Sequence, residues 1–93
     1  MNFEWDARRN ASNLRKHRVG FEEAASVFLG PLARIFDDPC HSSTERREII
    51  VGHSVRDQLL LVCFTEETDT VRLISARRAT RRERNDYEEN SKD

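Results

Sequence analysis

The chain has 93 residues, of which 37% are hydrophobic and 35% are charged. This length suits one modest core, and we treat residues 1–93 as one small domain. Its apolar runs are shorter than the roughly 18 residues that a membrane span needs. Two cysteines cannot form a disulfide framework. We therefore expect a protein of the reducing cytoplasm with no membrane association.

The net charge of −1 conceals an uneven distribution of charged side chains. Residues 1–70 carry nine basic and twelve acidic side chains, whereas residues 71–84 carry six arginines and one acid, Glu83. Arginine donates hydrogen bonds from a planar fork that matches phosphate or carboxylate, and it stacks on nucleobases. The segment 71–84 is therefore a candidate anion-binding region. A general codon bias towards arginine would produce the same composition.

The first part of the chain predicts a short strand and two helices. Residues 2–5 form the strand candidate, and Asp6 is a suitable N-cap for a helix over 7–17. From Phe21 onwards, apolar residues recur at i, i+3, i+4 and i+7, which predicts a second amphipathic helix. We expect that helix to end at Gly30, which precedes a proline.

Four further strand candidates follow, at 32–36, 47–53, 59–64 and 71–76, with a loop expected over 39–45. Short turns join the last three candidates, so an antiparallel meander is the simplest topology. Thr80 followed by Glu83 is a capping box, which predicts a last helix ending near Asn90. The expected fold is therefore an α+β domain, a twisted antiparallel sheet with its helices packed on one side.

The start of the last helix is unusual because Arg81 and Arg82 lie in its first turn. Cations there oppose the helix dipole, so a sequence selected only for helix stability would favour acids. Backbone N–H groups with these arginines, and with Arg77 and Arg78 at the preceding strand end, would bind an anion. One interpretation is a surface for a phosphate backbone. The alternatives are a solvated basic face and a site for an acidic protein.

Three other kinds of residue have a structural and a functional interpretation. His17, at the end of the first helix, is either a proton-transfer group or a helix cap. Trp5 and Tyr87 either stack on bases or anchor the core. Cys40, His41 and His53 lack the spacing of a zinc site, so we expect no metal and no cofactor.

Several segments together resemble the BrnT family, toxins of type II toxin–antitoxin systems. The resemblance extends over about residues 3–89 and rests on motifs in the order of the family. These are FEWD at 3–6, NLRKH at 13–17, FEEAASVF at 21–28, Gly52, ISARRATRRE at 74–83 and Tyr87.

The resemblance implies a RelE-like fold and a ribonuclease that cleaves RNA and arrests translation and growth. It implies neutralisation by a BrnA-type antitoxin, a ribbon-helix-helix protein, in a complex of two toxins and two antitoxins. Operator DNA would then be bound only through the antitoxin. Matching polar positions of the family are Lys16, His17, Arg47, Ser75, Arg77, Arg78, Glu83 and Tyr87, with Trp5 near the start.

Metal-independent RNA cleavage needs a charged group to stabilise the phosphorane and groups to move two protons. We assign the first task to Arg77 and Arg47, and proton transfer to His17, with Lys16 or Tyr87 next. Binding of the RNA chain is assigned to Arg78, Arg81, Arg82 and Trp5. Two non-catalytic alternatives stay open, a module that only binds nucleic acid and a subunit that only acts as corepressor with the antitoxin.

Overall fold

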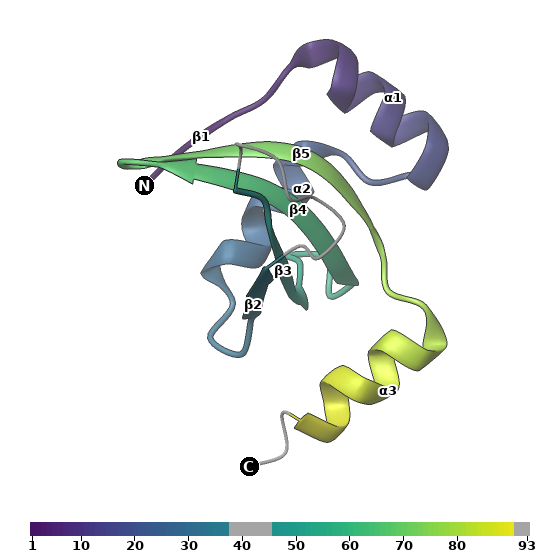
Figure 1. Cartoon of the computed structure of the whole chain (residues 1–93). Coiled ribbons are helices and arrows are strands. Elements are labelled where there is room, and N and C mark those ends of the chain that lie inside the picture. Colours follow the sequence, from purple (N-terminus) through teal and green to yellow (C-terminus); the bar gives the residue numbers. More distant parts are fainter. Residues whose placement is uncertain (38–45, 91–93) are drawn as a thin grey trace.

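The computed structural model describes residues 1–37 and 46–90, and Figure 1 shows the course of the chain. Its elements are β1 (Asn2–Glu4), α1 (Ala7–His17), α2 (Phe21–Ser26), the 3-10 turn η1 (Val27–Leu29), β2 (Arg34–Asp37), β3 (Glu48–His53), β4 (Leu59–Glu67), β5 (Thr70–Arg78) and α3 (Arg81–Asn90). The loop expected over 39–45 lies outside the described residues. The element order and the α+β class match the expectation from the sequence.

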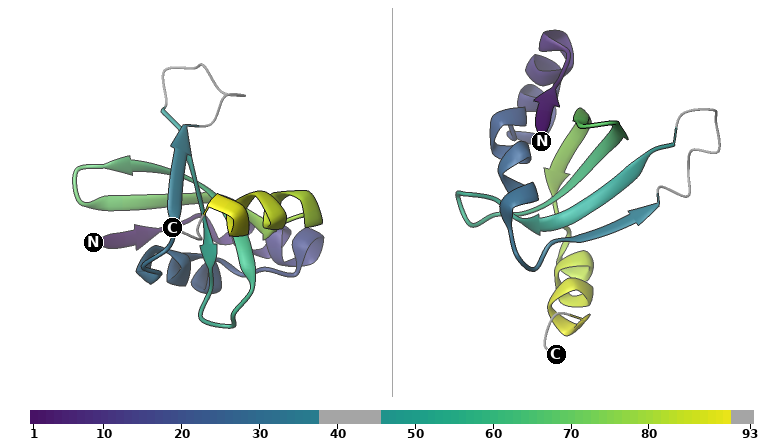
Figure 2. Two further views of the ribbon diagram at one scale, coloured as in Figure 1. Left: turned by 90° about the horizontal axis from the view of Figure 1, so that it is seen from below. Right: turned by 90° about the vertical axis from the view of Figure 1, so that its left-hand side faces the viewer.

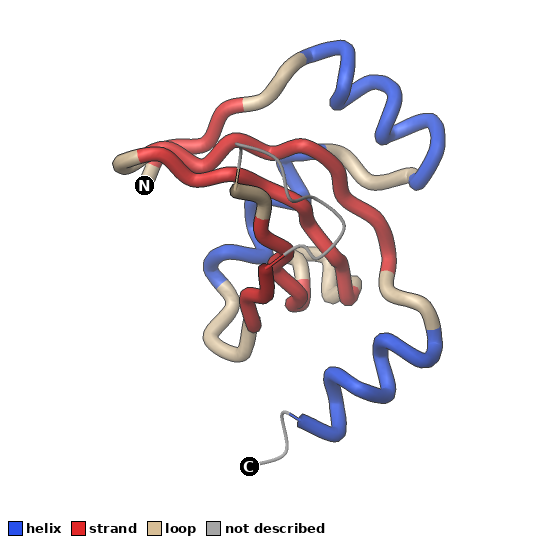
Figure 3. Tube along the Cα trace, viewed as in Figure 1, coloured by secondary structure: helices blue, strands red, loops and turns tan. Residues whose placement is uncertain are grey.

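Five strands form one sheet in the order β1-β5-β4-β3-β2. The meander from β2 to β5 is antiparallel, as expected. The expectation of a wholly antiparallel sheet is wrong at one edge, because β1 pairs with β5 in the parallel direction, from Asn2 opposite Thr70 to Glu4 opposite Arg72. A parallel neighbour requires a crossover, and here the chain passes through α1, α2 and three strands before it returns beside β1. Figure 3 shows the strands together, with the helices around them.

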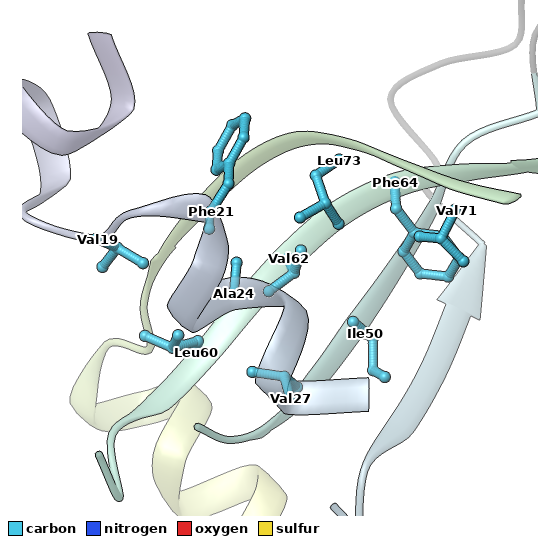
Figure 4. Close-up of a cluster of buried hydrophobic side chains, with 11 residues drawn as sticks. Val19, Phe21, Ala24, Val27, Ile50, Leu60, Val62, Phe64, Val71 and Leu73 are labelled. Carbon is cyan, nitrogen blue, oxygen red and sulfur yellow. The ribbon is translucent and has the colours of Figure 1, made fainter. Parts of the chain in front are cut away.

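The main core lies between one face of the sheet and the segment of α2 and η1. Phe21, Ala24 and Val27 are fully buried there against side chains of the central strands, as Figure 4 shows. The strand residues in this cluster are Ile50, Leu60, Val62, Phe64, Val71, Leu73 and Ala76. The predicted apolar stripe of the second helix is therefore the face that it buries. The helix ends earlier than expected because its last turn tightens into η1.

Gly52 allows η1 and the chain after it to approach β3 closely. A Cβ atom at this position would lie 3.0 Å from the Cβ of Ala33 and 3.1 Å from Cγ1 of Val27. Those distances are too short for ordinary carbon contacts. Glycine is thus the residue that fits between the sheet and this segment.

The last helix does not lie on the face that α2 and η1 cover, which corrects the expectation that all helices cover one face. Tyr87 of α3 clusters with Val51 and Leu59 on the second face of the sheet, and its hydroxyl donates a 2.8 Å hydrogen bond to the carbonyl of Leu32. Figure 2 shows α1 and α3 at opposite ends of the molecule.

Candidate functional site

A hollow of about 210 Å³ lies on the second face of the sheet. It is lined by His17, Arg47, Ile49, Leu61, Cys63, Ile74, Ser75, Ala76 and Arg77. The lining includes aliphatic side chains of neighbouring strands and polar side chains of three separate segments. The hollow thus places two arginines and a histidine together against an apolar sheet surface.

A β-bulge in β5 determines which residues of this strand reach the hollow. Cys63 pairs with Ser75 and Phe64 with Leu73, so Ile74 is an extra residue with no direct partner. Because side chains alternate along a strand, one extra residue reverses the faces beyond it. Leu73 and Ala76 therefore both enter the main core, three positions apart, while Arg77 lies on the opposite face.

Helix α1 brings His17 to the same hollow. Asp6 caps this helix as predicted, and accepts hydrogen bonds from the backbone N–H groups of Arg8 and Arg9 at 2.7 and 3.2 Å. The helix ends at His17, and its C-cap residue Arg18 adopts a left-handed conformation (φ 60°). The sequence left open that His17 caps this helix, but the C-cap residue is Arg18. His17 is an exposed residue of the last helical turn and lines the hollow.

A buried asparagine holds α1 against β5. The Nδ2 group of Asn13 donates 2.8 Å hydrogen bonds to the carbonyls of Val19 and Ala76, and its Oδ1 accepts from the N–H of Ala76 at 3.0 Å. Asn13 thereby satisfies backbone groups of β5 beyond the stretch that pairs with β1. Sequence reasoning missed this role, although an asparagine at 13, within a helix, was the available signal.

Arg77 is held by Glu83 of α3. Its Nη1 and Nη2 atoms donate to the two carboxylate oxygens of Glu83 at 2.8 and 2.9 Å. This bond lowers the pKa of Glu83 to about 2 and raises the pKa of Arg77. Both groups are therefore charged at neutral pH. The side chains are 42% and 33% exposed, so the pair contributes about 1 kcal/mol or less to stability.

The structure brings together three of the five residues assigned to catalysis. Arg77, Arg47 and His17 line the hollow. Lys16 is exposed in the same helical turn as His17 but does not line it. Tyr87 is also absent from the lining; it is 7% exposed, and its hydroxyl is bonded to a backbone carbonyl. The core interpretation of Tyr87 is therefore confirmed by its packing.

The four residues assigned to RNA binding lie outside the hollow. Arg78, Arg81 and Arg82 are exposed at the end of β5 and the start of α3. Trp5 is half-buried and contacts Phe21 edge to face, with ring centroids 6.1 Å apart. Its packing against the main core agrees with the structural interpretation of this residue.

A second hollow, of about 410 Å³, lies between α3 and the sheet. It shares Ile49 and Leu61 with the first hollow, and Glu83 and Tyr87 contribute to its other side. Glu83 is thus placed between the two hollows. The sequence identified Glu83 as a helix cap, but its partner Arg77 became visible only in three dimensions.

Within residues 1–37 and 46–90, no three side chains of metal-ligand type gather into a group. Cys40 and His41 lie outside the described residues. None of the described helices is long and apolar enough to cross a membrane.

Comparison with known proteins identifies the class and then the family. A family model described as the ribonuclease toxin BrnT of type II toxin–antitoxin systems matches residues 5–83. The α+β fold with its arginine-lined hollow thus belongs to a ribonuclease toxin of such a system. Within that class, the chain is a member of the BrnT family.

A solved structure has the same fold. The crystal structure of the Brucella abortus ribonuclease toxin BrnT matches with a TM-score of 0.67 and 20% sequence identity, over 87% of this chain and 99% of that chain. At this level of identity the likeness concerns the fold. The comparison with curated proteins produced no significant match.

Proposed function

We propose that this protein cleaves RNA without a metal ion, in the hollow that contains Arg77, Arg47 and His17. The observation that carries the proposal is the convergence of these three side chains from β5, from the segment before β3 and from α1. No motif in the sequence joins them, and a hydrophobic core alone would not require two arginines and a histidine to meet on one sheet face.

The proposed reaction is an internal phosphoryl transfer. The ribose 2′-oxygen loses its proton and attacks phosphorus, the bond from phosphorus to the 5′-oxygen breaks, and that oxygen takes up a proton. The products are a 2′,3′-cyclic phosphate and a 5′-hydroxyl. Arg77 and Arg47 would stabilise the negative charge of the phosphorane, because guanidinium groups stay charged and donate several N–H bonds.

Proton transfer is assigned to His17, which lines the hollow. Lys16 stays the next candidate, and Tyr87 follows it because the Tyr87 hydroxyl already donates to the carbonyl of Leu32. The exposed side chains of Arg78, Arg81 and Arg82 would hold the RNA backbone, and the half-buried Trp5 would contact a base outside the hollow. These assignments follow the chemistry of each side chain.

We further propose that a BrnA-type ribbon-helix-helix antitoxin neutralises the protein in a 2:2 complex, which binds operator DNA through the antitoxin. Membership of a type II system supports an antitoxin partner. Cleavage of cellular RNA would block translation and growth, and we propose the cytoplasm as the place of this activity.

The decisive experiment measures cleavage of a defined RNA by purified protein in the presence of excess EDTA. We expect products with a 2′,3′-cyclic phosphate and a 5′-hydroxyl, and no cleavage of the same strand with a 2′-deoxyribose at the cut site. Cleavage that requires added Mg²⁺, or that leaves a 5′-phosphate, would contradict the proposed reaction.

One observation favours a non-catalytic alternative: the bidentate ion pair with Glu83 already engages two N–H donors of Arg77. In that case the protein would bind RNA or DNA with a salt-dependent affinity and release no products. Expression of the chain alone separates the two hypotheses. If the wild type arrests growth and a variant without cleavage activity does not, the protein acts as an enzyme and not only as a binding module.

Replacement of His17 tests its role in proton transfer. We expect His17→Gln to lower kcat by about 10²–10⁴-fold and to remove one limb of the pH–rate profile. His53→Gln is the matched control, because His53 contacts Tyr87 edge to face at 5.8 Å and does not line the smaller hollow. A His17→Gln enzyme that retains both limbs would exclude His17 as the acid or base.

A further inference from the structure

Glu83 is fixed at more points than a helix cap requires. Its Oε1 accepts a 2.8 Å hydrogen bond from the N–H of Thr80, and its own N–H donates to Oγ1 of Thr80 at 3.2 Å. These two bonds complete the capping box of α3. The bidentate bonds to Arg77 come in addition. The carboxylate is therefore anchored by α3 while it holds a side chain of β5.

The bonds to Glu83 determine the orientation of the Arg77 guanidinium. Its Nη1 also donates to the carbonyl of Arg78 at 3.3 Å, so three of its five N–H donors have partners within the described chain. The two other donors are the Nε–H and the second hydrogen of Nη2. Because the guanidinium is planar, its bidentate bonds to Glu83 also set the directions of these two.

Glu83 itself lines the larger hollow and not the smaller one, so it does not share the lining that contains Arg47 and His17. An effect of Glu83 on the reaction would therefore pass through Arg77. The ion pair is too exposed to be a major source of stability. Its bidentate geometry instead holds the long side chain of Arg77 in one orientation.

We propose that Glu83 is a positioning residue, which orients the Arg77 guanidinium towards the scissile phosphate and ties that orientation to the docking of α3. This inference rests on the proposed function of Arg77. Glu83, the single acid within the arginine-rich segment 71–84, would then have a role in the reaction. Preorganised donors stabilise developing charge without reorganisation during the reaction, which is the advantage of a fixed fork.

The test compares two variants with the wild-type protein in RNA cleavage. Glu83→Gln keeps an oxygen that can accept from the N–H of Thr80 but removes the charge that binds Arg77. We expect kcat to fall by about 10- to 100-fold with KM changed by less than about threefold, because misplaced groups lower the rate of the chemical step. Thr80→Ala is the matched control, since it removes one bond of the capping box and leaves the ion pair. We expect its kcat to stay within about twofold of wild type.

A double-mutant cycle supplies the second measurement. In the Arg77→Ala background, adding Glu83→Gln should leave kcat unchanged, because the group to be positioned is absent. Separate NMR signals for the Arg77 side-chain N–H groups, expected in the wild type, should merge in Glu83→Gln as the guanidinium begins to rotate freely.

Three outcomes would overturn the inference. These are a wild-type kcat in Glu83→Gln, an equal loss of kcat in Thr80→Ala, and a further loss in the double mutant. A wild-type protein that cleaves no RNA would instead overturn the proposed function. An active wild type with an unimpaired Glu83→Gln variant would overturn the positioning role alone.

Discussion

Replacement of Arg77 by alanine is expected to reduce RNA cleavage by about 10²–10³-fold, the usual loss when one preorganised donor to a developing charge is removed. The expected cause is loss of the guanidinium that lines the hollow beside Arg47 and His17. The variant should remain folded, because the side chain is 42% exposed and its partner Glu83 stays accessible to water. Cleavage kinetics, with circular dichroism as a check of folding, measure the effect.

Arg72→Ala is the control for this experiment. Arg72 lies on the same strand and also pairs with a carboxylate, that of Glu4 at 3.1 Å, and its side chain is 49% exposed. It lines neither of the two hollows on the second face. We expect the Arg72→Ala protein to cleave RNA within about twofold of the wild-type rate. A folded Arg77→Ala protein with undiminished cleavage would remove Arg77 from the proposed mechanism.

The largest expected effect on stability comes from Asn13, which is 6% exposed. Asn13→Ala removes three hydrogen bonds and leaves the N–H of Ala76 buried without its partner. We expect the free energy of unfolding to fall by about 3 kcal/mol, because each unsatisfied buried group costs about 1–3 kcal/mol. For a domain of this size the melting temperature would fall by roughly 12–24 °C. Thermal unfolding followed by circular dichroism measures both quantities.

Asn10→Ala provides a matched comparison on the same helix. Asn10 is half-buried, and its Oδ1 accepts one hydrogen bond, from the N–H of Phe21 at 2.9 Å. We expect a loss of about 1 kcal/mol for this variant. If Asn13→Ala unfolded at the same temperature as Asn10→Ala, the three bonds of Asn13 would not be the main attachment of α1 to β5.

Features that depend on neighbours in the sequence were predictable. Asp6 caps α1, Phe21 starts an apolar stripe that α2 and η1 bury, and Thr80 and Glu83 form the predicted capping box. Each of these depends on residues within a few positions of one another, and the physical rule that relates them is local. The antiparallel pairing of the last three strands was predictable for the same reason, since short turns join them.

Features that depend on distant residues were not predictable in this way. Nothing local indicates that β1 runs parallel to β5, or that Tyr87 carries α3 to the second face of the sheet. The sequence also suggested that Arg77, Arg78, Arg81 and Arg82 form one anion site at the start of α3. The structure separates Arg77, in the hollow, from Arg78, Arg81 and Arg82, which are exposed outside it.

The amino-acid sequence alone was thus sufficient to determine the fold class, most element boundaries and the kinship with BrnT toxins, because local periodicity, caps and motifs encode them. Which side chains meet was decided by the tertiary structure. The bulge at Ile74 is the physical reason for the site, since one extra residue in β5 turns Arg77 away from the core. On that face, Arg77 lines the same hollow as His17 of α1 and bonds to Glu83 of α3, so residues from opposite ends of the chain meet at Arg77.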